Sequence, residues 1–260
     1  MLSLLVVLVA VWGLPSTALA QSALGTGEDK VSEGVANVTD PERYEAGIAA
    51  FEASPTHDTL LWQQRLSGDL GMRDAPWPGT HNSFNSNAEM GAALSAKDSN
   101  QQLKIVDQLR LGVRSLELDV HSWLGRPTVC HAQANHEGCT VEKPLAEVLP
   151  PIAAFMREHP GEVLFLYAEN HLDDAAGHDA GAAVMREALG SLLYTPRGSG
   201  CTELPDELTR DDILAAGAQV VVVSDCEAGG TASGWNGVAH AWSDHLESRP
   251  QGFEGYPSCG

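Results

Sequence analysis

The sequence predicts a mixed α/β fold built around a mainly parallel sheet. From about residue 70 onward, apolar runs of strand length alternate with segments of helical periodicity, as in βαβ units. The run Val220–Val223 is apolar at every position, which favours a strand covered on both faces. Polar residues follow several of these runs directly. Both a barrel and an open α/β sheet that carry their site at the carboxyl edge give this pattern.

The expected elements can be placed in order along the chain. One or two helices are predicted within 46–68. Hydrophobic periodicity, with Gly and Pro as element ends, predicts the rest. Strands are expected before His81 and over 113–120, 127–132, 162–168 and 219–224. Helices are expected over 99–111, 145–158 and 175–193. Pro150 and Pro151 are expected to interrupt or restart the helix at 145–158. Thr209 with Asp212 predicts a capped helix that Gly217 ends.

The chain divides into three predicted regions. Residues 1–20 are an apolar run ending in Ala18-Leu19-Ala20, which predicts a secretory signal peptide and therefore a secreted protein. An N-terminal anchor is the alternative, because no Lys or Arg precedes the run. A leader and N-terminal helical segment follow over 21–69, and a catalytic unit over 70–260. An eight-stranded barrel takes roughly 250 residues, so we expect this barrel to be incomplete at the C-terminus.

The charge composition indicates which kinds of partner the chain could bind. The chain of 260 residues has 15 basic and 35 acidic side chains and a net charge of −20. Nucleic-acid phosphates would repel such a chain, whereas an acidic cleft would attract a metal cation. Nothing in the sequence indicates an obligate protein partner, and a monomer is expected.

The five cysteines fit an oxidising destination. None of them forms a C-x-x-C pair, so a zinc ribbon or a thioredoxin-like motif has no support. Their pairing is open, and a bridge from Cys130 to Cys139 is one of the possibilities.

Glu117 and Asp119 carry the first chemical signal. They lie two residues apart on a predicted strand, so both side chains point to the same face. Two carboxylates held close together repel each other unless a cation lies between them. The structural alternative is a salt bridge to Arg114 or Arg126.

His81 and His131 each lie at the end of a predicted strand, so in a barrel the two imidazoles could face each other across the mouth. Imidazole is the usual general acid and base at neutral pH. His121, His136, His171 and His178 are expected to be structural or surface residues.

Asn82 and Glu169 complete an oxygen-rich set with the two carboxylates. Glu169 ends an apolar strand, where a carboxylate is unusual, and Asn82 follows His81. One amide oxygen and three carboxylates are ligands that select Ca²⁺ or Mg²⁺ over Zn²⁺. Such an ion would stabilise negative charge that develops on a phosphate.

Four motifs within residues 76–171 give the chain a family resemblance. They are P-G-T-H-N-S-F, Q-L-R-L-G-V-R-S-L-E-L-D-V, V-C-H and F-L-Y-A-E-N-H, in this order. Together they resemble the phosphatidylinositol-specific phospholipase C superfamily. The resemblance implies a TIM-like (β/α) barrel. It also implies cleavage of phosphatidylinositol, or a related phosphodiester, to diacylglycerol and an inositol phosphate that is cyclic or hydrolysed. A phospholipid at a membrane surface would be the substrate.

The resemblance also assigns roles within the site. Metal-independent members have Asp after the first His and Arg at the position of Asp119, whereas this chain has Asn82 and Asp119. It therefore resembles the calcium-dependent, secreted type, with Asn82, Glu117, Asp119 and Glu169 as Ca²⁺ ligands. His131 would be the general acid. Either Glu117 or His81 would take the proton of the inositol 2-hydroxyl, and the headgroup is left open.

Two other functions compete with this hypothesis. Glycerophosphodiester phosphodiesterases and sphingomyelinase D-like barrels also use two histidines and an E-x-D metal set, but they have H-R-G where this chain has H-N-S. A barrel that only binds its ligand is the other alternative. An acid and base pair argues against it, because binding alone needs neither.

Overall fold

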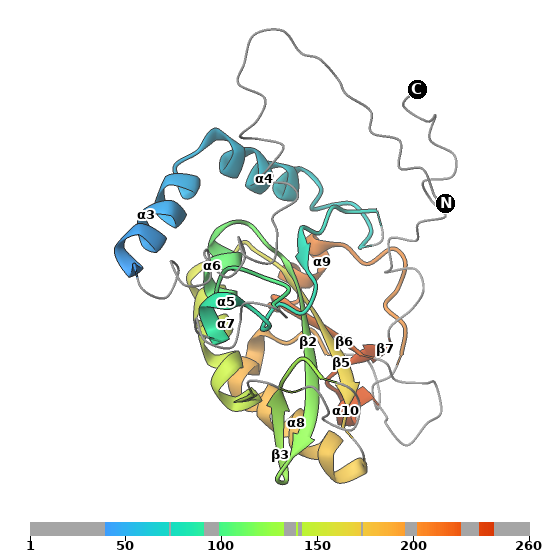
Figure 1. Ribbon diagram of the computed structural model, residues 1–260. Coiled ribbons are helices and arrows are strands. Elements are labelled where there is room, and N and C mark those ends of the chain that lie inside the picture. Colours follow the sequence, from blue (N-terminus) through green and yellow to red (C-terminus); the bar gives the residue numbers. More distant parts are fainter. Residues whose placement is uncertain are drawn as a thin grey trace, which may run out of the picture.

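The computed structural model describes residues 40–72, 74–90, 99–132, 139, 142–172, 174–195, 202–224 and 234–241. They form a mixed α/β structure around one seven-stranded sheet, whose strand order is β4-β3-β2-β5-β6-β7, with β1 also paired to β2 (Figure 1). The strands are β1 (Gly79–Thr80), β2 (Ser115–Trp123), β3 (Arg126–Val129), β4 (Lys143–Pro144), β5 (Leu164–His171), β6 (Val220–Ser224) and β7 (His240–Ala241).

The predicted mainly parallel sheet is confirmed. β1, β2, β5, β6 and β7 run parallel, and β3 and β4 are antiparallel additions next to β2. Over the described residues no pairing joins β7 to β1, so this part of the sheet is open. Closure into a barrel stays a prediction.

The helices lie close to the predicted positions. They are α3 (Pro41–Glu52), α4 (Pro55–Leu66), α5 (Asn87–Met90), α6 (Ile105–Arg110), α7 (Leu145–Glu158), α8 (Ala175–Leu189), α9 (Arg210–Ala215) and α10 (Gly234–Gly237), with a 3₁₀ turn at Gly190–Leu192. No helix in the described ranges combines the length and apolarity needed to cross a bilayer.

The N-terminal helical segment begins earlier than its predicted helices. Asp40 caps α3 through the backbone N–H of Arg43, and Pro41 occupies the first turn, where a missing N–H costs nothing. The predicted signal peptide (1–20) and residues 21–39 of the leader lie outside the described residues.

The expectation that Pro150 and Pro151 break the helix at 145–158 is wrong. α7 continues through both prolines as one helix of 14 residues. Both prolines point away from the core, while Leu149 and Ile152 on either side are fully buried. Packing of this apolar face outweighs the roughly 3 kcal/mol that each proline costs in a helix interior.

Side chains on the two faces of the sheet separate into two clusters. On one face, residues such as Leu118, Leu166 and Val222 pack with α7 and α8, which lie together on that side of the sheet (Figure 1). On the other face, Phe165 and Val221 belong to a second, smaller apolar cluster. Both faces are therefore covered, as the unbroken apolar strands predicted.

The second face changes character along the strands. Near the amino ends of β5 and β6 it is apolar, whereas towards the carboxyl ends of β2 and β5 it carries acids and imidazoles. The pleat sends every second side chain to this face, so it presents Glu117, Asp119 and His121 from β2. This face of the sheet is therefore polar towards the carboxyl ends of its strands and apolar towards their amino ends.

The predicted capping box at Thr209 is confirmed and gives a test of local stability. Thr209 Oγ1 accepts from the Asp212 backbone N–H at 3.0 Å, and Asp212 Oδ2 accepts from the Thr209 backbone N–H at 3.0 Å. Thr209→Ala should lower the free energy of unfolding by about 1 kcal/mol, measured by urea denaturation. Thr209→Ser keeps the hydroxyl and should retain most of the stability. An equal loss in both variants would show that the methyl group, not the cap, matters.

Candidate active site

Paired residues of β2 and β5 form the floor of the candidate site. In the parallel register Glu117 lies opposite Tyr167, Asp119 opposite Glu169, and His121 opposite His171. All six residues occupy alternate positions, so their side chains share the polar face. A pair of carboxylates is therefore followed, towards the carboxyl edge, by a pair of imidazoles.

Asp119 has a strongly perturbed carboxyl group. It is only 5% exposed. Burial, followed by the nearby charges of Glu169 and Glu117, raises the pKa of Asp119 to about 7. Desolvation and like charge thus both oppose ionisation, and a cation at this position would relieve both.

His171 connects the carboxylate pair to the imidazole pair. Its Nε2 lies 3.0 Å from Glu169 Oε1, and this contact lowers the pKa of Glu169. Its ring also stacks on that of His121, with centroids 4.5 Å apart and planes 19° apart. Potential ligand atoms of Asp119, His121 and His171 lie within 4.8 Å of one another.

The turn after β1 brings His81 and Asn82 to Glu117. Asn82 has φ = 47°, a left-handed conformation that asparagine tolerates better than most residues. Its backbone N–H donates to Glu117 Oε2 at 3.1 Å, and His81 Nε2 lies 3.5 Å from the same oxygen. The His81 side chain is 69% exposed. It is therefore open to a substrate while Glu117 contacts it from the sheet.

The side-chain oxygen of Asn82 is chemically unusual. Asn82 is only 4% exposed, and within the part of the chain that the structure describes no donor reaches its Oδ1. Its Nδ2 donates to Asn100 Oδ1 at 3.3 Å, which leaves the oxygen as the free end of the amide. A buried acceptor without a donor is costly unless a cation takes its place.

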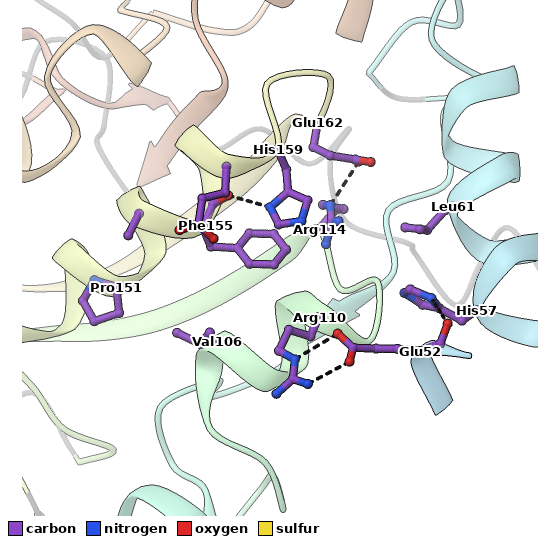
Figure 2. A pocket seen from close by; sticks show the side chains of 12 residues that line it. Glu52, His57, Leu61, Val106, Arg110, Arg114, Pro151, Phe155, His159 and Glu162 are labelled. Carbon is purple, nitrogen blue, oxygen red and sulfur yellow. Dashed lines mark hydrogen bonds and ion pairs between the residues drawn. The ribbon is translucent and has the colours of Figure 1, made fainter. Parts of the chain in front are cut away.

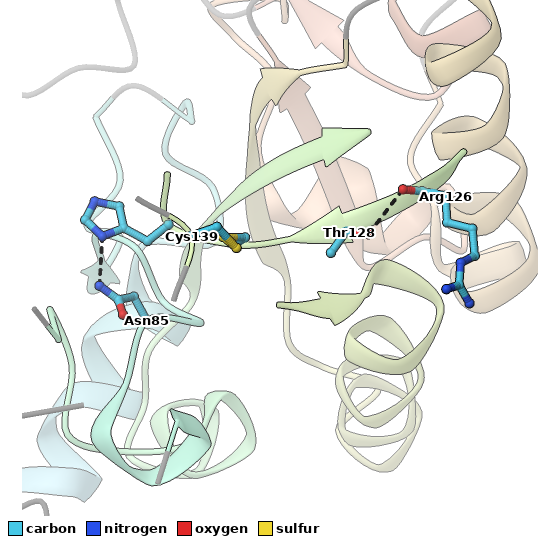
Figure 3. The surroundings of a disulfide bond; sticks show 6 residues. Asn85, Arg126, Thr128 and Cys139 are labelled. Atoms are coloured by element: carbon cyan, nitrogen blue, oxygen red, sulfur yellow. Dashed lines mark hydrogen bonds between the residues drawn. A yellow bond between two sulfur atoms is a disulfide. The ribbon is translucent and has the colours of Figure 1, made fainter. Parts of the chain in front are cut away.

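Two asparagines hold His131 in a defined orientation. Asn85 Nδ2 donates to Asn100 Oδ1 at 2.6 Å and lies 3.0 Å from His131 Nδ1 (Figure 3). Because the amide nitrogen can only donate, Nδ1 of neutral His131 must accept. The ring proton of that tautomer is then on Nε2. Asn100 Oδ1 accepts from both Asn82 and Asn85, so it links the loop of His81 to His131.

A disulfide fixes the residue next to His131. Cys130 is fully buried and bonded to Cys139, which makes the previously open pairing a feature of the structure (Figure 3). The Cys130 backbone N–H also donates to the Asp119 carbonyl oxygen at 3.2 Å. The bridge therefore anchors the chain at the point where His131 leaves β3.

The structure brings most of the predicted site residues to one edge of the sheet. Glu117, Asp119 and Glu169 share the polar face, His81 and Asn82 contact Glu117, and Asn85 and Asn100 link Asn82 to His131. Arg114, an alternative partner for the carboxylates, pairs instead with Glu162 at 3.2 Å.

Sequence reasoning missed four residues of this site. His121 and His171, expected to be structural or surface residues, lie beside Asp119 and Glu169. Asn85 and Asn100 connect the loop of Asn82 to His131. The i+2 spacing that revealed Glu117 and Asp119 also includes His121, and Glu169 with His171 has the same spacing. That signal was present in the sequence.

A separate cavity of about 510 Å³ lies at the opposite end of the sheet (Figure 2). Residues of α3, α4, α6 and α7 line it, including Glu52, Leu61 and Phe155. Arg114 and Glu162, which also line it, precede β2 and β5 and form a buried ion pair. This cavity is therefore remote from the carboxyl ends where the acids and imidazoles gather.

The raised pKa of Asp119 predicts a pH-dependent stability in the presence of a chelator. The folded state holds this proton up to about pH 7, whereas an unfolded aspartate releases it near pH 4. The stabilisation is therefore complete below about pH 4 and is lost as the pH rises to about 7, a change of up to about 4 kcal/mol. Asp119→Asn does not titrate. Its stability relative to the wild type, measured by urea denaturation, should increase over this window. A constant difference between pH 4 and 8 would contradict the shift.

Comparison with solved structures finds partial similarities. A phosphatidylinositol-specific phospholipase C from Listeria monocytogenes is 17% identical, with 63% of this chain and 55% of that chain covered and a TM-score of 0.45. The S. officinalis protein PLC21 is 18% identical, with 66% and 23% covered and a TM-score of 0.45.

Curated relatives extend over most of the chain. A Mycobacterium tuberculosis protein, "Uncharacterized protein Rv2075c", is 38% identical over 239 residues, which cover 83% of this chain and 48% of the relative. An "Uncharacterized secreted protein" of Arthroderma benhamiae is 28% identical over 130 residues, covering 50% of this chain and 28% of the relative. The chain thus spans about half the length of the mycobacterial relative.

A protein-family model matches most of the chain, including the four motifs within residues 76–171. Residues 41–260 match the family described as the Rv2075c PI-PLC-like domain, from the start of α3 through the whole described sheet. The match includes His81, Asn82, Glu117, Asp119, His131 and Glu169. The chain therefore belongs to the Rv2075c PI-PLC-like domain family.

Proposed function

We propose that this protein is a secreted, Ca²⁺-dependent phosphodiesterase that cleaves phosphatidylinositol or a related phosphodiester. The observation that carries the proposal is the combination of Asp119, buried among like charges, with the donor-free Oδ1 of Asn82. Both features cost free energy in the absence of a cation. Family membership supports the choice of a phosphodiester as substrate.

The side chains that would hold Ca²⁺ are Asn82, Glu117, Asp119 and Glu169. They offer one amide oxygen and three carboxylates, a hard donor set of the kind that calcium takes. When bound, the ion would supply positive charge to the phosphate oxygens. The Glu117 carboxylate contacts the Asn82 backbone N–H, so the loop and the sheet would be joined in holding the ion.

His81 and Glu117 are suited to accept a proton. Their side chains lie 3.5 Å apart, and His81 is the more exposed of the two. In the proposed reaction a substrate hydroxyl gives its proton to this pair, and its oxygen forms a new bond to phosphorus. For an inositol 2-hydroxyl the product is a cyclic phosphate.

His131 is suited to donate a proton. The contact with Asn85 directs Nδ1 to the protein and leaves the proton on Nε2. To act as the acid His131 would be an imidazolium with a proton on each ring nitrogen, and the Asn85 amide would then present its Oδ1 to Nδ1–H. As the bond from phosphorus to the glycerol oxygen breaks, this imidazolium would give its Nε2 proton to the leaving oxygen and become neutral. The attacking hydroxyl thus loses one proton, and the leaving glycerol oxygen gains one to give diacylglycerol.

The proposal places the protein outside the cell, with a phospholipid of a membrane surface as its substrate. The Cys130–Cys139 bridge fits an oxidising compartment. The name of the Arthroderma relative also includes the word secreted.

Activity should depend on Ca²⁺. Removing free calcium with EGTA should abolish cleavage of phosphatidylinositol vesicles, because the phosphate charge would then lack its counter-ion. Added Ca²⁺ should restore cleavage, measured by release of diacylglycerol. Cleavage that is unchanged in EGTA would rule out the calcium assignment.

His131→Ala should lower kcat by about 10²–10⁴, as expected for loss of a general acid. A nitrophenyl ester of inositol 1-phosphate keeps the 2-hydroxyl but has a leaving group that needs no protonation, so the variant should lose much less activity on it. His159→Ala is a matched control, because His159 is exposed and lies at the opposite end of the sheet, after α7. An equal loss on both substrates would remove His131 from the role of acid.

A further inference from the structure

We propose that Asp119, His121 and His171 form a binding site for a transition-metal ion of the Zn²⁺ class. This site differs in its donors from the calcium set, which contains only oxygen. It stands on geometry and does not depend on which phosphodiester the protein cleaves.

Strand pairing creates the site. His121 and His171 are directly opposite each other in the β2–β5 register, one alternate position beyond the pair of Asp119 and Glu169. Their rings are stacked at a centroid distance of 4.5 Å. One potential ligand atom from each of Asp119, His121 and His171 lies within 4.8 Å of the others, close enough for small side-chain movements to bring all three to one ion.

Burial and charge favour a cation in this triangle. Asp119 is 5% exposed and His121 is 1% exposed, so two of the three ligands are already removed from water. His171 is only partly buried, which leaves one side from which an ion and a substrate or water could enter. Glu169 and Glu117 add negative charge around Asp119 without belonging to the triangle.

Glu169 supplies the support that metal-bound histidines usually have. Its Oε1 lies 3.0 Å from Nε2 of His171. A carboxylate in contact with one ring nitrogen fixes the orientation of the imidazole and makes the other nitrogen a better ligand. The same carboxylate is thus an expected Ca²⁺ ligand and a positioning residue for His171.

The donor chemistry decides the class of ion. Two imidazole nitrogens and one carboxylate suit Zn²⁺, Co²⁺ and related ions, whereas Ca²⁺ takes oxygen ligands. Three protein ligands leave coordination positions open, as in catalytic or inhibitory sites rather than closed structural ones. Because Asp119 belongs to both sets, a Zn²⁺-class ion and Ca²⁺ would compete for the protein.

Co²⁺ is the probe for this site because its visible absorption reports its ligands. The purified chain, freed of metal, should bind one Co²⁺ in a saturable titration. His171→Asn and His121→Asn should each weaken binding at least about tenfold, a loss of about 1.4 kcal/mol or more. Glu117→Gln removes a nearby charge but no ligand of the triangle, and should weaken Co²⁺ binding less than either histidine variant. His159→Gln controls for binding by an exposed imidazole.

A second measurement on the wild type covers the case in which the buried His121 variant does not fold. Electron spin-echo modulation of the protein with one equivalent of Cu²⁺ should show two coordinated imidazoles. Fewer than two imidazoles, or equal Co²⁺ affinity in wild type and the folded His171→Asn variant, would overturn the proposal. In that case the stacked pair is a packing feature only. Ca²⁺-dependent cleavage is measured separately, so failure of one proposal is distinguishable from failure of the other.

Discussion

The pairing register between β2 and β5 is the constraint on which the site depends. It places Asp119 beside Glu169 and His121 beside His171 while it buries Leu118 and Ala168 on the opposite face. A shift of one residue would exchange these faces, burying carboxylates under α7 and exposing leucines. The apolar face therefore holds the polar face in register, and the free energy gained from core packing offsets the repulsion among the acids.

Much of this arrangement follows from short-range patterns in the sequence. The order of strands and helices, the common face of Glu117 and Asp119, and the capping box at Thr209 all depend on residues close together in the chain. Such patterns are set by backbone geometry, so periodicity reveals them. The continuous helix through Pro150 is different, because its stability comes from tertiary packing that no local rule includes.

The residues that sequence reasoning missed depend on contacts between distant segments. His121 lies next to another imidazole only because His171, 50 positions later in the chain, pairs opposite it. Asn85 and Asn100 are ordinary loop residues until their amides meet His131 and Asn82. The i+2 spacing places His121 on the face of Asp119, but it does not show which residue of a distant strand lies opposite, and a loop asparagine has no such spacing at all.

The disulfide at Cys130 gives the protein a dependence on its compartment. The described strands β1, β2, β5 and β6 are held by backbone pairing and apolar packing, neither of which needs a cysteine. The Cys130–Cys139 bridge adds a covalent anchor only to the segment that carries His131. In a reducing cytosol the chain could thus form its sheet while the segment of His131 lost its covalent tether. Oxidation would then fix the position of His131, so the redox state of the compartment would control the geometry of the site separately from the fold.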